Sequence, residues 1–281
     1  MKIIDSFFDM MELINKMDGE FDIDLWETYI EKIATGLSKK LKFDSNNYDF
    51  YNDIIPVINL AINDTGKLKE AHNSFTKSME YLSDKIQNVV GFNLQVDIIF
   101  YIGLCNGAGW ATELNGRKIV LLGVEKIIEL DWCDCDDIKT LVYHELGHIW
   151  HDQTGTFQIA NTIREKYMLQ LFREGIATYF EQTLSGNLFY YRWNKEDWLK
   201  WCVNNKRKLF TEFLKRLQSN ESAQDFFGDW NNYCGYSDVG YFIGCEFVKL
   251  LARKYSLSEI VNLELIQVFD EFCKITDSDW I

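Results

Sequence analysis

One short motif restricts the fold of this chain more than any other feature of the sequence. His144 and His148 are separated by three residues, and Glu145 directly follows the first of them. Two histidines at positions i and i+4 lie one above the other when the backbone between them is helical, and both imidazoles can then bind one zinc ion. Glu145 can reach a water molecule at the open coordination position of such a metal. The motif therefore predicts a metal-binding helix.

The motif supplies two ligands, whereas a catalytic zinc takes three protein ligands and one water. His151 lies on the same predicted helix face and stands where the metzincin family has glycine. Three ligands from one rigid helix converge poorly on a tetrahedral ion, so we expect His151 to be a partly exposed residue near the helix end. Glu174 is the better third ligand because it lies on the next predicted helix. The sequence predicts one zinc ion per chain, bound by His144, His148 and Glu174.

Small and polar residues follow Glu174 on its predicted helix. Gly175 and Ala177 predict a close crossing with the metal-binding helix, since neither carries a large side chain. Thr178 lies one turn beyond Glu174 and is a candidate to hydrogen-bond a metal-bound histidine. Glu181 lies two turns beyond Glu174 on the same face and is a second candidate for a supporting role.

Residues 144–150 together with residues 174–181 resemble the gluzincin group of zinc metallopeptidases, the clan of thermolysin and aminopeptidase N. The form Glu-Gly-x-Ala-x-Tyr is closer to aminopeptidase N and its uncharacterised bacterial relatives than to thermolysin. The resemblance implies a small sheet followed by the metal-binding helix and a helical lobe. It also implies zinc-dependent hydrolysis of peptide bonds, with Glu145 as the general base that takes the proton of the attacking water.

A weaker similarity lies further along the chain. Residues 241–251 are similar to the Tyr-x-x-Gly helix of the aminopeptidases, whose tyrosine stabilises the oxyanion. This implies the same role for Tyr241, and Gly244 would let the helix approach another helix closely. Tyr233 and Tyr236 lie nearby in the sequence and remain alternatives for that role.

The glycine-rich substrate-binding strand of the family has a counterpart at Gly107, Ala108 and Gly109, about the right distance before the metal helix. The aminopeptidase strand ends in Met-Glu-Asn, whose glutamate holds the free amino group of the substrate, and no such segment follows Gly109 here. Glu113 is the alternative for this role, so exopeptidase and endopeptidase specificity both remain open. The large β domain that precedes catalysis in the aminopeptidases also has no counterpart in the sequence.

The hydrophobic pattern divides the chain into three stretches. Residues 1–90 have apolar residues at helical spacing, and residues 94–124 alternate between apolar and polar residues as strands do. An Asn-Gly pair in this second stretch predicts a tight hairpin, so we expect a small antiparallel sheet. Helical spacing returns in two metal-binding helices over residues 136–184 and in a C-terminal lobe over residues 187–281. We predict an α+β, mainly helical, gluzincin-like fold with an N-terminal helical region and a catalytic region, residues 91–281.

Composition restricts the partners of the chain. The 29 basic and 43 acidic residues give a formal charge of −14, which argues against binding to the phosphates of nucleic acids. The longest apolar run, residues 98–105, is far shorter than the ~18 residues of a membrane helix. Seven cysteines without a recognisable secretion signal predict reduced thiols. We expect a cytoplasmic protein whose partner is a peptide or protein substrate, with no nucleic acid and no membrane involved.

The leading interpretation is a cytoplasmic zinc metallopeptidase in which an extended peptide pairs with the strand edge near residues 118–123. The main alternative is a catalytically inactive, metallopeptidase-like module that binds peptides or regulates a partner. The intact His-Glu-x-x-His motif and Glu174 favour the enzyme, because a decayed site usually loses its general base first. The sequence leaves open the substrate and the oligomeric state.

Overall fold

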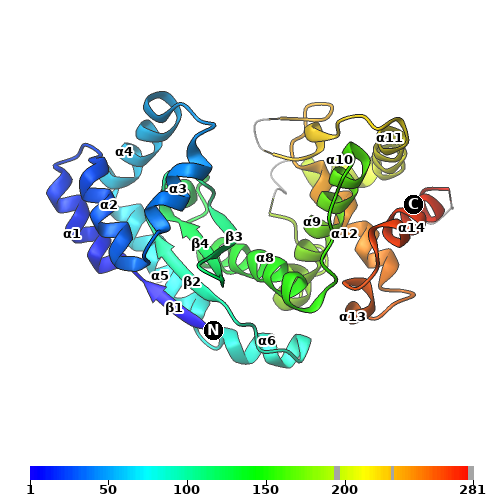
Figure 1. Ribbon diagram of the computed structural model, residues 1–281, viewed down its shortest axis with the longest axis horizontal. Coiled ribbons are helices and arrows are strands. Elements are labelled where there is room, and N and C mark those ends of the chain that lie inside the picture. The colour runs from blue at the N-terminus through cyan, green and yellow to red at the C-terminus, as the bar shows by residue number, and fades with distance from the viewer. Residues whose placement is uncertain (193–196, 229–230, 278–281) are drawn as a thin grey trace. The chain divides into compact units, whose positions relative to one another are not determined.

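The computed structural model describes residues 1–192, 197–228 and 231–277 (Figure 1). Among these residues helices predominate, and they are accompanied by a four-stranded sheet. The predicted α+β, mainly helical class with a small sheet is therefore confirmed. The final residues of the predicted C-terminal lobe, 278–281, lie outside the described residues.

The chain forms two compact units, residues 1–146 and residues 147–281. The division lies inside helix α8 (Cys135–Thr154), so that this one continuous helix belongs to both units. The sequence instead placed a boundary after residue 90. That boundary falls inside the first unit, because the N-terminal segment supplies a strand to the sheet and helices that pack on it.

The sheet is mixed, whereas the sequence predicted an antiparallel one. Its order is β1-β2-β4-β3; β2 pairs in parallel with both β1 and β4, and β3 pairs antiparallel with β4. The four strands are β1 (Lys2–Asp5), β2 (Asp97–Tyr101), β3 (Gly109–Leu114) and β4 (Arg117–Gly123). The antiparallel prediction is correct for the hairpin alone, since parallel neighbours are joined by long crossovers that leave no local signal.

The hairpin turn between β3 and β4 has the predicted geometry. Asn115 and Gly116 both have positive φ, at 51° and 77°, as a two-residue turn of this kind requires. Leu114 and Arg117 face each other directly across the turn. The pairing of β3 with β4 therefore follows from local sequence.

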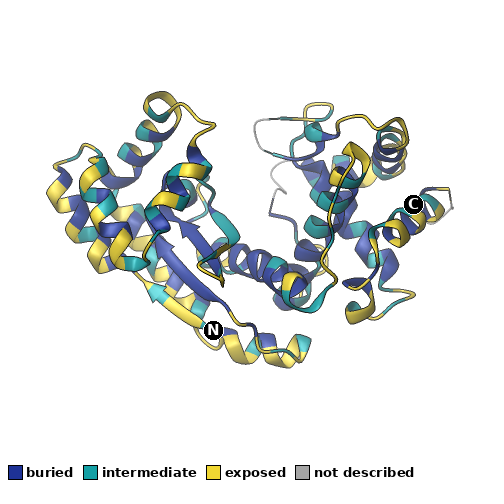
Figure 2. Cartoon of the chain, viewed as in Figure 1, coloured by how far each residue is buried: buried dark blue, intermediate teal, exposed yellow. Residues whose placement is uncertain are grey.

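Helices cover the sheet of the first unit. All five residues of β2 are buried (Figure 2), and the ring of Phe100 stacks on Phe75 with 4.8 Å between centroids. The indole N–H of Trp26 donates to the carbonyl of Ile102 just beyond β2, at 3.0 Å. The elements around the sheet are α1 (Phe7–Met17), α2 (Ile23–Ile33), α3 (Leu37–Ser45), the π-helix η1 (Phe50–Ile54), α4 (Ile55–Asn63), α5 (Thr65–Met79), α6 (Leu82–Val90) and α7 (Val124–Glu129).

The described part of the second unit is helical. Thr162 and Glu165 form a capping box at the start of α9, and Gly186 ends that helix in the left-handed conformation. Ser256 and Glu259 form a second capping box, which opens a helix of a single turn. After the second half of α8 the elements are α9 (Ile163–Ser185), α10 (Trp198–Asn204), α11 (Lys206–Ser219), the 3-10 helix η2 (Gln224–Phe226), α12 (Val239–Leu251), α13 (Leu257–Ile260) and α14 (Leu265–Thr276).

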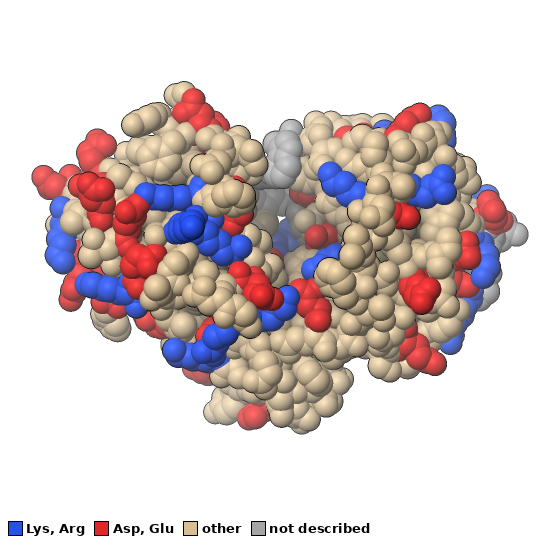
Figure 3. Space-filling view, in the orientation of Figure 1, with Lys and Arg blue, Asp and Glu red and all other residues tan. Residues whose placement is uncertain are grey.

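Basic and acidic side chains are mixed on the surface. On the face drawn in Figure 3, Lys and Arg side chains lie beside Asp and Glu side chains on both units. Lys40 pairs with Asp44 at 3.4 Å, and Lys126 pairs with Glu129. Within the described residues, no helix has both the length and the apolar character that crossing a membrane requires.

Candidate metal centre

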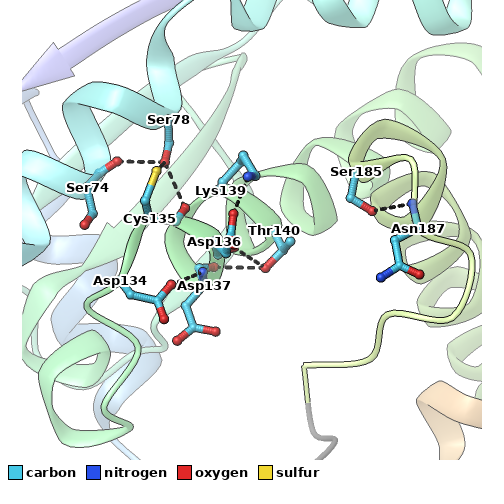
Figure 4. A network of polar contacts seen from close by, with 10 residues as sticks. All are labelled: Ser74, Ser78, Asp134, Cys135, Asp136, Asp137, Lys139, Thr140, Ser185 and Asn187. Carbon is cyan, nitrogen blue, oxygen red and sulfur yellow. Dashed lines mark hydrogen bonds and ion pairs between the residues drawn. The ribbon is translucent and has the colours of Figure 1, made fainter.

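Helix α8 starts at a polar cluster that fixes its first turn. The Asp134 carboxylate accepts the N–H of Asp137 at 2.8 Å, and Asp136 and Asp137 place negative charge at the positive end of the helix. The hydroxyl of Ser78 on α5 lies 3.4 Å from the carbonyl of Cys135 (Figure 4). The helix therefore begins at a fixed point of the first unit.

Two turns of α8 and one turn of α9 bring three metal-ligating side chains together. His144 and His148 follow one another along α8, and Glu174 projects from α9. One ligand atom from each residue lies within 4.8 Å of the others. His148 Nε2 is 3.3 Å from Glu174 Oε2. The structure therefore gathers the three residues that the sequence singled out as ligands.

The two helices can meet this closely because small residues stand at their crossing. A Cβ atom added to Gly147 would lie 2.8 Å from the Cα of Ala177, so the backbones of α8 and α9 are in contact there. The predicted role of Ala177 is confirmed. Gly175 instead faces α12, where an added Cβ would lie 2.4 Å from the carbonyl oxygen of Gly244. The prediction that Gly175 crosses the metal helix is wrong, whereas the predicted close approach of Gly244 to another helix is confirmed.

This second crossing predicts a loss of stability in the Gly244→Ala variant. An added Cβ would lie 2.6 Å from the carbonyl oxygen of Leu171 and 3.1 Å from the Cα of Gly175, and neither backbone atom can rotate away. We expect the free energy of unfolding to fall by about 1–3 kcal/mol, which a thermal melt reports as a lower Tm. Gly66→Ala is the matched control, because the nearest atom there is a side-chain oxygen at 3.3 Å. Equal melting temperatures for the two variants would contradict the close crossing.

Glu145 lies beside the three ligands but faces the sheet. Its side chain is 7% exposed, and Oε2 accepts the N–H of Ala111 on β3 at 2.8 Å. An added Cβ on Gly109 would lie 2.8 Å from Oε1 of Glu145 and 2.7 Å from a methyl group of Leu141. Gly109 therefore allows β3 to approach the carboxylate, which the sequence did not predict.

Strand β3 is the free edge of the sheet at this end. Strand β4 is paired on both sides, so the peptide-docking edge predicted at residues 118–123 is wrong. The turn pairs Leu114 with Arg117, and alternation along the ladder then directs the backbone groups of Gly109, Ala111 and Glu113 away from β4. The N–H of Ala111 bonds to Glu145 accordingly.

The other predicted substrate residues lie in the loop before β3. Gly107 has a φ of +153°, which glycine adopts more readily than other residues. Ala108 is buried, and its carbonyl accepts the N–H of Gly123 at 3.0 Å. Gly109 lies in direct proximity to Glu145.

The three candidate tyrosines have different surroundings. Tyr236 stacks on Trp201 with 4.3 Å between centroids, and Tyr233 packs on Phe226 at 4.8 Å. Tyr241 lies in the first turn of α12, half-buried, with its ring edge-on to Phe227 at 6.1 Å. Tyr241 also lies one turn before Gly244, the residue that meets α9 next to Glu174.

His151 is buried rather than partly exposed, so this prediction is wrong. Its side chain is 4% exposed and meets the ring of Phe172 edge-on at 5.7 Å. Burial, followed by the neighbouring charges of Arg173 and His148, lowers the pKa of His151 to about 3. His151 does not belong to the ligand cluster found among the described residues.

Thr178, Glu181 and Glu113 are the remaining candidates from the sequence, and their surroundings differ. The hydroxyl of Thr178 is fully buried without a hydrogen-bond partner among the described residues. Glu181 forms a buried ion pair with Arg192 at 3.0 Å, a partner that no local pattern indicated. Glu113 is exposed and pairs with Lys118 across the hairpin at 3.4 Å.

No protein-family model, curated protein or solved structure matches this chain. The function has to be inferred from the donor atoms and their surroundings.

Proposed function

We propose that this chain is a zinc-dependent metallopeptidase of the gluzincin type. The cluster of His144, His148 and Glu174 carries the proposal, because two imidazole nitrogens and one carboxylate oxygen are a donor set that suits a catalytic zinc. Their mutual distances of at most 4.8 Å suit ligands that share one ion. A zinc ion held there would lower the pKa of a bound water and polarise a carbonyl group.

Glu145 is the general base in this proposal. It would accept a proton from the attacking water and deliver it to the leaving amine. The Ala111 N–H donates to one of its oxygens at 2.8 Å and so orients the carboxylate. Its position next to His144 in the chain places it at the ligand cluster without making it a member of that cluster.

A peptide substrate would extend the sheet at β3. The outward backbone groups of Gly109 and Glu113, together with the carbonyl of Ala111, offer donors and acceptors to an extended chain, the mode of recognition known as β-augmentation. Because β3 leads directly to Glu145, a peptide bound there would run past the general base. The formal charge of −14 also supports a peptide rather than a nucleic acid as the ligand.

Tyr241 is the proposed donor to the oxyanion. A phenol that donates only in the transition state should affect kcat far more than KM. We expect Tyr241→Phe to lower kcat by about 10²–10³-fold at nearly unchanged KM and Tm. Steady-state kinetics and a thermal melt check this result.

Tyr236→Phe and Tyr233→Phe are the matched controls for Tyr241→Phe. Both residues precede α12, the helix that meets α9 next to Glu174, so their phenylalanine variants should retain turnover. A loss of kcat in Tyr236→Phe alone would assign the oxyanion role to that residue instead.

A peptide-library digest tests the proposal as a whole. The purified protein is incubated with the library, and the products are identified by mass spectrometry. We expect cleavage that stops with a zinc chelator and returns when zinc is restored. A protein that binds zinc and peptides but cleaves none of them would instead be the catalytically inactive module.

A further inference from the structure

A fully buried carboxylate, that of Glu125, contacts the start of the loop that leads into β3. Glu125 is the second residue of α7, and its side chain is 0% exposed. Its Oε2 accepts the N–H of Gly103 at 2.8 Å, and its Oε1 accepts the N–H of Cys105 at 3.0 Å. One carboxylate therefore spans two backbone amides of the same loop.

The backbone is built around this carboxylate on both sides. An added Cβ on Gly103 would lie 2.8 Å from Oε1 of Glu125, and one on Gly123 would lie 3.0 Å from the same oxygen. On Gly123 the added atom would also lie 2.6 Å from the carbonyl oxygen of Gly107. Glycine at these positions lets the loop and the end of β4 close around the acid.

The loop needs such support because its backbone is strained. Cys105 has a φ of +56°, a backbone conformation that residues other than glycine rarely adopt. Such a conformation persists only where neighbouring contacts enforce it. Asn106 provides a second anchor, since its amide donates to the carbonyl of Leu41 on α3 at 3.0 Å. The loop then enters β3 at Gly109, two residues before the amide that donates to Glu145.

We propose that Glu125 is a positioning residue, whose carboxylate fixes the loop over residues 103–108 and thereby holds the Ala111 N–H against Glu145. This role rests on the proposed function in so far as it concerns turnover. The local order of β3 is a property of the chain itself and can be measured without a substrate.

The charge of Glu125 supports this role. Burial raises the pKa of Glu125 to about 6, against the opposing effect of the Gly103 and Cys105 amides and of Lys126. Burial also raises the pKa values of Tyr29, Tyr101 and the Cys105 thiol around it, so among these groups Glu125 alone changes its charge between pH 5 and pH 7.

The effect of Glu125 on global stability has the opposite sign to its effect on the loop. Because the folded pKa lies above the unfolded value, this group favours the folded state below its unfolded pKa, and the contribution is lost as the pH rises through about 6. The ionised carboxylate nevertheless accepts both amides at neutral pH. The Gly103 and Cys105 amides lower the pKa of Glu125, so a loop that releases the still-buried carboxyl raises that pKa, and protonation therefore favours the released loop.

Hydrogen exchange by mass spectrometry tests the proposal in Glu125→Gln. The glutamine amide would direct N–H groups towards an N–H donor, so we expect exchange in residues 103–111 to rise by about 10- to 100-fold. Exchange in residues 135–146 should stay close to wild type. In the wild type, exchange in 103–111, corrected for intrinsic rates, should also rise between pH 7.5 and pH 5, and this pH dependence should vanish in Glu125→Gln.

Gly103→Ala is a second variant that keeps the carboxylate and displaces the loop, and it should raise exchange in the same segment. Glu129→Gln, an exposed change on the same helix as Glu125, should leave exchange in residues 103–111 unchanged.

Unchanged exchange in residues 103–111 in both Glu125→Gln and Gly103→Ala, or an equal rise in residues 135–146, would overturn the proposal. Where wild-type cleavage is measurable, kcat should fall in Glu125→Gln, and unchanged kcat with a loosened loop would also overturn it. Failure of wild-type cleavage would reject the peptidase function, while exchange at Ala111 would still decide the role of Glu125.

Discussion

The Glu145→Gln variant is expected to keep its zinc and to lose about 10²–10⁴-fold in kcat. Glutamine has nearly the shape of glutamate and can still accept the N–H of Ala111, but it cannot take a proton from water at neutral pH. Because Glu145 is not among the three clustered ligands, the metal content should not change. Turnover and zinc content, measured on the same preparation, check both parts of this prediction.

Glu129→Gln is the matched control for the Glu145→Gln variant. Glu129 is an exposed acid of the same unit that pairs with Lys126, so removal of its charge should leave turnover unchanged. Wild-type kcat in Glu145→Gln would show that another group moves the proton. Loss of zinc from that variant would show that Glu145 is itself a ligand.

The Glu174→Ala variant is expected to lose most of its zinc and its activity. Removal of one of three ligands should weaken binding by more than the ~10–100-fold that is typical when a ligand's own hydrogen-bond partner is removed. Zinc per folded chain after dialysis, measured by elemental analysis, reports the effect.

Two control variants separate loss of a ligand from loss of structure. Asp152→Ala removes an acid of α8 that pairs with Arg173 at 3.0 Å, and it should retain zinc. His151→Ala removes a buried ring packed on Phe172, so it should lower the Tm and still retain zinc. Full zinc occupancy in Glu174→Ala would reject the third ligand. Loss of zinc in His151→Ala at normal folding would assign a ligand role to that histidine.

Local sequence was sufficient wherever one short segment determines the structure. The spacing of His144 and His148 predicts a helix, and Asn115 and Gly116 predict a tight hairpin; the structure has both. In each of these cases the interacting atoms lie within a few residues of one another. The helices and the hairpin were therefore predictable from the sequence alone.

Contacts between distant segments were not predictable in the same way. Strand β1 pairs with β2 nearly a hundred residues later, and its four residues show no alternating burial that would mark a strand. The burial of His151 depends on Phe172 of another helix. Gly175 meets α12 rather than α8, because the register of two helix crossings is set by packing and not by composition.

The candidate site also combines features that local sequence predicts with contacts between distant segments that it does not. The three candidate ligands follow from a motif and a spacing, whereas the Ala111 N–H on Glu145 involves a backbone atom that carries no signal in the sequence. Glu125 was equally hidden, because an acid near the start of a short helix is usually exposed. Its partners are backbone amides about twenty residues earlier in the chain.

The zinc content of the wild-type chain tests the central claim most directly. Protein dialysed against zinc and then against metal-free buffer is analysed by native mass spectrometry, beside the His144→Ala/His148→Ala double variant. We expect about one zinc per wild-type chain and none in the double variant. A wild-type chain that retains no zinc, or a double variant that retains as much as the wild type, would contradict the metal centre and the peptidase function that depends on it.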